Sequence, residues 1–168
     1  MGTGSPTHPE RILTTFASLA DLKAAVGTEL GTSEWHTIGQ EQVNLFAEAT
    51  GDHQWIHVDP ERAATGPFGS TVAHGYLTLA LVPVLVSSLV DYSGWSVKIN
   101  YGSNKVRFPL PVPVDSSLRA GVEVAAVTEV GSGLQVAMKV TVEIRTPSGE
   151  VAPKPALVAE TLTLTHGR

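Results

Sequence analysis

The sequence predicts an α+β fold in which an antiparallel sheet wraps around a long central helix, and two observations carry this prediction. The first is the almost continuously apolar segment 74–90, which is typical of a helix with protein on all sides. The second is a change of period after residue 96, where apolar and polar residues alternate as in strands with one buried face. Proline and glycine gather between these strands, at 109–113, 130–133 and 147–149, and predict turns there.

The first elements are a short helix and a strand. Apolar residues at helical spacing predict an amphipathic helix within residues 14–26, with Ser18 as its N-cap. Segment 31–37 then has the composition of a strand.

A second helix is predicted over residues 40–50. Thr37 and Gln40 have the spacing of a capping box at its start, and Gly51 supplies its end. This helix leads the chain directly into Asp52.

Two more helices are expected before the strands. Asp59 and Pro60 are suited to an N-cap and a first turn, so a short helix should cover residues 60–64. Segment 74–90 forms the central helix and should bend at Pro83, because proline has no N–H to donate. Polar residues interrupt this segment, which favours a helix buried in protein over one that crosses a membrane.

Four alternating series predict the strands, and each should turn one face toward the central helix. The series are Val97, Ile99 and Tyr101; Leu118, Ala120, Val122 and Val124; Leu134, Val136, Met138, Val140, Val142 and Ile144; and Leu157, Ala159, Thr161 and Thr163.

Composition limits the classes of function. With 168 residues, 42% of them hydrophobic, we expect a disordered leader over 1–13 and one domain over 14–168. A net charge of −5 without a basic cluster argues against a nucleic-acid partner. The lack of cysteine excludes disulfides and thiolate nucleophiles. Without a secretion signal or a membrane span, a cytoplasmic protein with no membrane partner is expected.

The densest group of polar side chains lies between Gly51 and Gly75. Asp52 and His57 are five residues apart in a loop and have the chemistry of an acid/base pair. Alternatively, Asp52 caps a turn after the helix and His57 is a structural histidine. Gly75 begins the central helix, where backbone N–H groups can hold a ligand carbonyl, or it only relieves crowding.

The run GDHQWIHVDPERA, followed by AHGYLT, resembles the hydratase motif of the MaoC-like dehydratases, the (R)-specific enoyl-CoA hydratases. That motif reads Gly-Asp-x-Asn-Pro-x-His with a later His-Gly. The resemblance continues through INYGSNKVRFPLPVPV, covers nearly all of the chain after about residue 14, and is strongest to the nodulation-protein-N-like actinobacterial branch. It implies a hot-dog fold, a homodimer without a cofactor, and a hydro-lyase that interconverts trans-2-enoyl-CoA and (R)-3-hydroxyacyl-CoA.

The resemblance also implies roles for particular residues. Asp52 and His57 stand at the positions of the catalytic pair, and Gly75 at that of the backbone donor to the thioester carbonyl. The chain departs from the motif at Gln54 and Trp55, which replace the usual Asn and Pro. The longer side chain of Gln54 places its amide elsewhere than asparagine would, which leaves its contact with water or substrate open.

The chemistry of hydration assigns these residues as follows. His57 acts as the base toward water, Asp52 positions that water and shuttles the proton, and the Gly75 N–H stabilises the enolate. Ser70 either adds a hydrogen bond near the thioester or caps its own loop.

Two weaker patterns concern charged groups. Lys105 and Arg107 alternate on one strand, and they either bind the coenzyme A phosphates or form a solvated face. His53, His57 and His74 match no zinc spacing, so no metal is expected.

Two other functions remain open. A hot-dog thioesterase would need a carboxylate on the central helix, and segment 76–90 has none. A non-catalytic acyl-thioester binding module would not need both Asp52 and His57.

In the expected homodimer, the sheet edge and a flank of the helix meet the second copy, with the acyl tunnel close by. Leu77, Leu81, Trp95 and Phe68 are the candidates for the end of that tunnel.

Overall fold

The computed structural model describes residues 13–167, and its main element is a six-stranded antiparallel sheet. The strand order is β2-β8-β9-β10-β6, and β3 also pairs with β8. The expected leader falls, except for its last residue, outside the described residues. The strands are β2 (Glu29–Thr32), β3 (His36–Thr37), β6 (Val97–Arg107), β8 (Ser117–Val130), β9 (Gly133–Arg145) and β10 (Leu157–His166).

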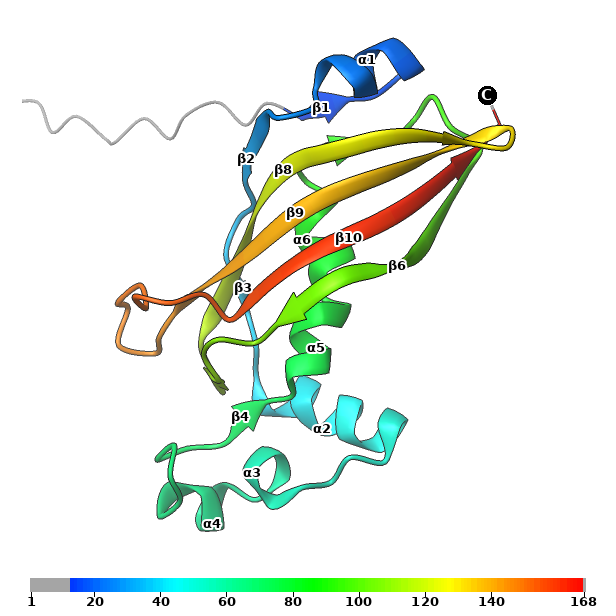
Figure 1. The fold of residues 1–168 in the computed structure, drawn as a ribbon. Coiled ribbons are helices and arrows are strands. Elements are labelled where there is room, and N and C mark those ends of the chain that lie inside the picture. Colours follow the sequence, from blue (N-terminus) through cyan, green and yellow to red (C-terminus); the bar gives the residue numbers. More distant parts are fainter. Residues whose placement is uncertain (1–12, 168) are drawn as a thin grey trace, which may run out of the picture.

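The predicted central helix lies across one face of this sheet as two consecutive segments, α5 (Gly75–Ala80) and α6 (Val82–Val86) (Figure 1). The break at Leu81 comes just before Pro83, which has no N–H to continue the helical hydrogen bonds. Within residues 13–167 no helix is long and apolar enough to cross a membrane. The expectation that protein surrounds this helix is wrong for the single chain, because Tyr76 and Val84 remain 73% and 55% exposed.

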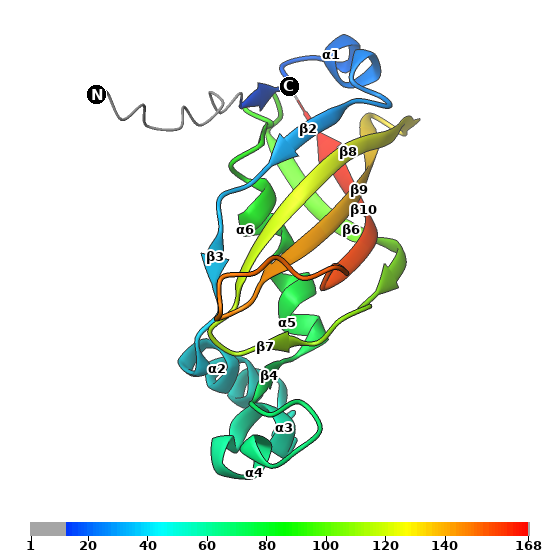
Figure 2. The same ribbon diagram turned by 90° about the vertical axis from the view of Figure 1, so that its left-hand side faces the viewer.

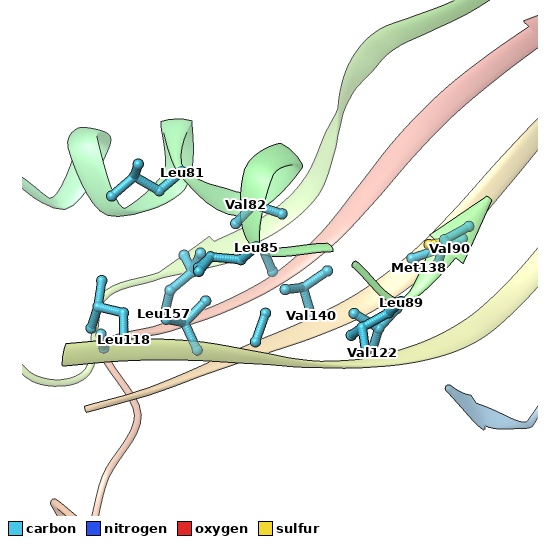
Figure 3. Packing of buried hydrophobic residues seen from close by; sticks show 14 of the residues in the cluster. Leu81, Val82, Leu85, Leu89, Val90, Leu118, Val122, Met138, Val140 and Leu157 are labelled. Atoms are coloured by element: carbon cyan, nitrogen blue, oxygen red, sulfur yellow. The ribbon is translucent and has the colours of Figure 1, made fainter. Parts of the chain in front are cut away.

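The core lies between α5, α6 and the sheet. The alternation predicted for β8 and β9 is confirmed, since every apolar residue in those two series is buried. Apolar burial of this kind is the main stabilising term of the fold. Figure 3 shows the contact between Leu81, Val82 and Leu85 of the helices and Leu118, Val140 and Leu157 of the strands.

Strand β6 contradicts the expected pattern. Val97, Ile99 and Tyr101 should have faced the core, but they are 47%, 45% and 60% exposed. Because β6 is an edge strand, it has a neighbouring strand, β10, on one side only. On this strand it is Lys98 and Asn100 that line the space toward the helix.

The N-terminal helix is shorter than predicted. It forms α1 (Leu19–Ala24), and its cap is confirmed because the Ser18 hydroxyl accepts a hydrogen bond from the Asp21 N–H. The residues before it form β1 (Thr14–Thr15), which pairs with β5 (Val90–Asp91).

The single strand expected over 31–37 is split into β2 and β3. Between them, the Ser33 N–H donates to the Ala120 carbonyl, and the Ser33 hydroxyl accepts from the Ala120 N–H. The Ser33 hydroxyl thus accepts the hydrogen bond that a backbone carbonyl would accept in a regular strand pair. The pairing of this segment with β8 is interrupted there.

Beyond one end of the sheet lie three helices and a short strand pair (Figure 2). They are α2 (Gln40–Thr50), α3 (Trp55–Val58), α4 (Pro60–Ala64), β4 (Val72–Ala73) and β7 (Val112–Pro113). Helix α2 has the predicted bounds and ends at Gly51, whose φ of 79° suits glycine. Asp59 caps α4 through its carboxylate, as predicted.

The predicted capping box does not form. The N-cap of helix α2 is Gly39, which has no side chain to cap it, and the Thr37 hydroxyl pairs with that of Ser117 across β3 and β8. The Gln40 amide extends instead toward α3, where it contributes to the site.

Candidate active site

His57 lies on the short helix α3 and is buried, with 7% of its surface exposed. Its Nδ1 atom is 2.6 Å from the backbone carbonyl oxygen of Val72 in β4. A carbonyl oxygen only accepts hydrogen bonds, so the neutral imidazole must carry its proton on Nδ1. The Nε2 atom of His57 is therefore unprotonated and can accept a proton.

His74 packs directly on this imidazole. The two rings are stacked with centroids 3.8 Å apart, and His74 is 3% exposed at the N-cap of α5. Its Nε2 atom donates to the backbone carbonyl of Asp52 at 2.9 Å. Its buried Nδ1 then holds a lone pair without a hydrogen-bond partner in the part of the chain that the structure describes. His74 thus connects the two residues of the predicted pair.

Asp52 follows Gly51 at the end of α2 and is exposed in the single chain. Its carboxylate accepts a hydrogen bond of 3.4 Å from the Gln54 N–H. One carboxylate oxygen of Asp52 and one nitrogen each of His57 and His74 lie within 4.8 Å of one another. The predicted pair is thus brought together, with His74 as a third member.

The donor atoms of this cluster are close enough together to hold a metal ion. The stacked rings of His57 and His74 are 25° from parallel, so one ring would have to turn before both could coordinate the same ion through their in-plane lone pairs. His53, the third histidine of the set considered from sequence, points instead toward Glu48, at 3.7 Å.

Burial lowers the pKa of His57 below its ordinary value of 6.5, and the neighbouring His74 lowers it further. The hydrogen bond to Val72 and the charge of Asp52 oppose this shift without cancelling it. The imidazole is therefore neutral at neutral pH, as a base must be.

We expect the pH profile of activity to reflect this shift. As pH falls, the acidic limb of kcat/KM should be centred below pH 6.5, because His57 is protonated at lower pH than an ordinary histidine. Initial rates across the pH range on the substrate expected from the sequence, an enoyl thioester, give the profile. An acidic limb centred at or above the ordinary value would contradict the assignment of His57 as the base.

Gln40 was expected to cap helix α2, but its side chain instead helps to position His57. Its side-chain amide nitrogen donates to the Asn44 side chain at 2.9 Å and to the His57 carbonyl at 2.7 Å. Its amide oxygen accepts from the Thr71 hydroxyl. One side chain thus connects α2, the helix of His57 and the segment that leads into β4.

Replacing Gln40 with alanine should lower kcat roughly tenfold with little change in KM, because His57 loses an anchor rather than its chemistry. Steady-state kinetics separate the two constants. Gln42→Ala, on the same helix, is the matched control and should behave as the wild type. Equal effects of the two variants would show that only the stability of α2 is involved.

A groove with a cavity volume of about 840 Å³ runs between the helices α5 and α6 and the strands β6, β9 and β10. Phe46 lines it and also contacts the His74 ring, with centroids 5.0 Å apart, so the groove adjoins the cluster. Apolar side chains of Leu79, Val82 and Val86 cover its helix side. None of the four residues expected to close the acyl tunnel lines this groove, because Leu77 and Leu81, for example, are buried in the core.

Comparison with known proteins agrees with this arrangement. The family model described as "MaoC like domain" matches residues 21–146. The chain belongs to this family. It is 56% identical over 149 residues to 3-hydroxyacyl-thioester dehydratase Z of Mycobacterium tuberculosis, covering 88% of this chain and 95% of that protein.

Two further relatives extend the comparison of this MaoC-like domain. Nodulation protein N of Rhizobium meliloti is 45% identical over 150 residues, covering 88% of this chain and 90% of that protein. The solved structure of an (R)-hydratase from A. caviae superposes with a TM-score of 0.61 at 25% identity, covering 82% of this chain and 94% of that one. The fold is accordingly a hot dog.

The other predicted site residues of the MaoC-like domain are more dispersed. Gly75 begins α5, where an added Cβ would lie 3.0–3.2 Å from ring carbons of Phe108, so close packing also favours glycine. The Ser70 hydroxyl bonds to the neighbouring Thr71 carbonyl, as expected of a loop-capping serine. Gln54 is exposed at the start of α3.

Lys105 and Arg107 project from β6 and are exposed. The Arg107 guanidinium donates to the Val106 carbonyl at 2.8 Å. Arg107 precedes Phe108, which packs on Gly75, so its strand ends beside the start of α5.

Proposed function

We propose that this MaoC-like domain is an (R)-specific enoyl-CoA hydratase that reversibly adds water to trans-2-enoyl-CoA. The observation that carries the proposal is the buried His57, with its Nδ1 held by the Val72 carbonyl and one ring nitrogen within 4.8 Å of an Asp52 carboxylate oxygen, next to a groove whose helix side is apolar. A base with a lowered pKa, a nearby carboxylate and an apolar channel are what hydration of an acyl chain requires. The similarity to a 3-hydroxyacyl-thioester dehydratase and to an (R)-hydratase supports the same reaction.

The proposed hydration uses only the side chains and backbone of this chain and needs no cofactor. His57 Nε2 removes a proton from water as the water oxygen bonds to the β-carbon, and the electrons of the double bond move to the thioester oxygen. The Gly75 N–H, which has no acceptor within its own helix, stabilises this enolate. Asp52 orients the water, accepts the proton from the His57 imidazolium and delivers it to the α-carbon as the enolate collapses, which yields (R)-3-hydroxyacyl-CoA and restores both side chains.

The proposed position of coenzyme A follows from the same geometry. Lys105 and Arg107 are exposed on the part of β6 that approaches Gly75, so phosphates can bind there while the acyl chain enters the groove. Ser70 and Gln54 would then flank the thioester as polar neighbours.

The direct test is the loss of enoyl absorbance when crotonyl-CoA, and then a longer enoyl-CoA, is mixed with the protein without added metal. Turnover is expected with at least one of them. If the thioester binds and its double bond persists, the hydratase proposal fails and the binding module replaces it. Release of free thiol would instead indicate a thioesterase, for which the groove lining offers no carboxylate among the described residues.

We further propose a homodimer that covers the β6 edge and the exposed flank of the central helix. The apolar side chains of Tyr101, Ile99 and Tyr76 are exposed there, as expected for an interface. Light scattering at micromolar concentration should give twice the chain mass, and Ile99→Lys should shift it toward the monomer. A wild-type protein that is only monomeric would overturn this proposal.

A further inference from the structure

The groove is apolar on its helix side and largely polar on its sheet side. Thr161 and Thr163 of β10 lie on the sheet side, and their register partners on β6 are Ser103 and Asn100. None of the lining residues is acidic, and Lys98 is the single charged one among them. A ligand made only of hydrocarbon would cover these polar groups without giving them hydrogen-bond partners, which is unfavourable. The lining therefore favours a ligand that carries polar atoms.

The side chains that β6 turns toward the groove are also polar. Successive side chains of a strand point to opposite faces. Lys98 and Asn100 line the groove, whereas Val97, Ile99 and Tyr101 do not, although all five residues are exposed in the single chain. The strand thus presents its polar residues to the groove.

Tyr92 and Lys98 form the polar end of the groove. The Lys98 ammonium lies 5.9 Å from the centre of the Tyr92 ring. The Tyr92 hydroxyl donates to the Met138 sulfur at 3.9 Å, and sulfur is a weak acceptor. Burial raises the pKa of this phenol far above its ordinary value, so it remains a donor at all physiological pH values. A better acceptor can therefore replace the sulfur.

This polar end lies away from the catalytic cluster. Gly75 follows His74 directly, and the helical rise from Gly75 to Val86 is about 17 Å. Tyr92 follows β5, near the end of the sheet where β6 begins, and β6 then runs back toward the start of α5 (Figure 1). A chain that reacts at His57 and follows the groove therefore brings its far end to Tyr92 and Lys98.

We propose that the groove selects acyl thioesters whose far end carries a carboxylate, held by the Lys98 ammonium and the Tyr92 hydroxyl. This inference rests on the proposed hydratase function and names its substrate class. A carboxylate accepts hydrogen bonds from both donors and neutralises the single charge of the groove. A methyl-terminated chain would desolvate both groups and give them no acceptor.

The test compares pairs of enoyl-CoA thioesters of equal length that end in a methyl group or a carboxylate, over several lengths. The wild type should prefer the carboxylate, at the length that reaches Lys98, by about tenfold or more in kcat/KM. Lys98→Met and Tyr92→Phe keep most of the side-chain volume and should each remove most of this preference, because the carboxylate-terminated substrate loses one of its two donors. Lys154→Met, on an exposed loop, should leave the preference unchanged.

A binding experiment separates this inference from the proposed reaction. Calorimetry with the corresponding saturated acyl-CoA pair measures the same preference without any turnover. If no enoyl thioester reacts but the saturated carboxylate binds more tightly in a Lys98-dependent way, the hydratase proposal fails and the groove assignment stands. Equal binding of the pair, or a preference that survives both variants, would overturn the inference.

Discussion

His57→Gln should lower kcat by about a hundredfold or more while the protein remains folded. Glutamine can still donate to the Val72 carbonyl from a similar position, but it offers no basic nitrogen in place of Nε2. The loss of enoyl absorbance gives the rate, and circular dichroism with thermal unfolding checks the fold. A variant that keeps a third of the wild-type rate would eliminate His57 as the base.

Asp52→Asn tests the other half of the pair and should cost a similar factor. Asparagine retains the shape and an acceptor for the Gln54 N–H, but it loses the charge that orients water and accepts a proton. Asp59→Asn is the matched control, because Asp59 lies in the same segment and asparagine also caps a helix. Comparable losses in both variants would indicate a structural effect of the segment rather than catalysis by Asp52.

His74→Phe should give a third, smaller effect, a fall in kcat of between about tenfold and a hundredfold. Phenylalanine can preserve the stack on His57 and the contact with Phe46, but it cannot donate to the Asp52 carbonyl. The Asp52 backbone then loses the hydrogen bond that holds it near the His57 imidazole, so the Asp52 carboxylate is less well positioned. His74 acts through its neighbours and is a positioning residue.

The pH profile distinguishes this role from a general loss of stability. His74 contributes to the lowered pKa of His57, so its removal should move the acidic limb of kcat/KM to higher pH, toward 6.5. Lower rates with an unshifted limb would mean that His74 only supports the fold. His53→Ala serves as the control, since that ring faces Glu48 and should affect neither constant.

Elements with a complete local signal were predicted correctly. Helix α2 ends where a glycine with positive φ is needed, α4 begins at an Asp-Pro pair, and the apolar residues predicted to face the core from β8 and β9 are all buried. Each of these signals acts within a few neighbouring residues, so a single sequence is enough to recognise it. The hot-dog fold and the positions of Asp52 and His57 came from the resemblance of the motif, and the family is confirmed.

What the sequence determined by itself is helices α2 and α4, strands β8 and β9, the family and the group of residues from which a site can be built. Only the tertiary structure decided which groups meet. The stack of His74 on His57, the contact of Gln40 with the His57 carbonyl, and the polar face that β6 turns to the groove all depend on how separate elements pack. Such contacts join residues distant in the chain, and an edge strand lacks the second neighbour that makes alternation a reliable guide to its buried face.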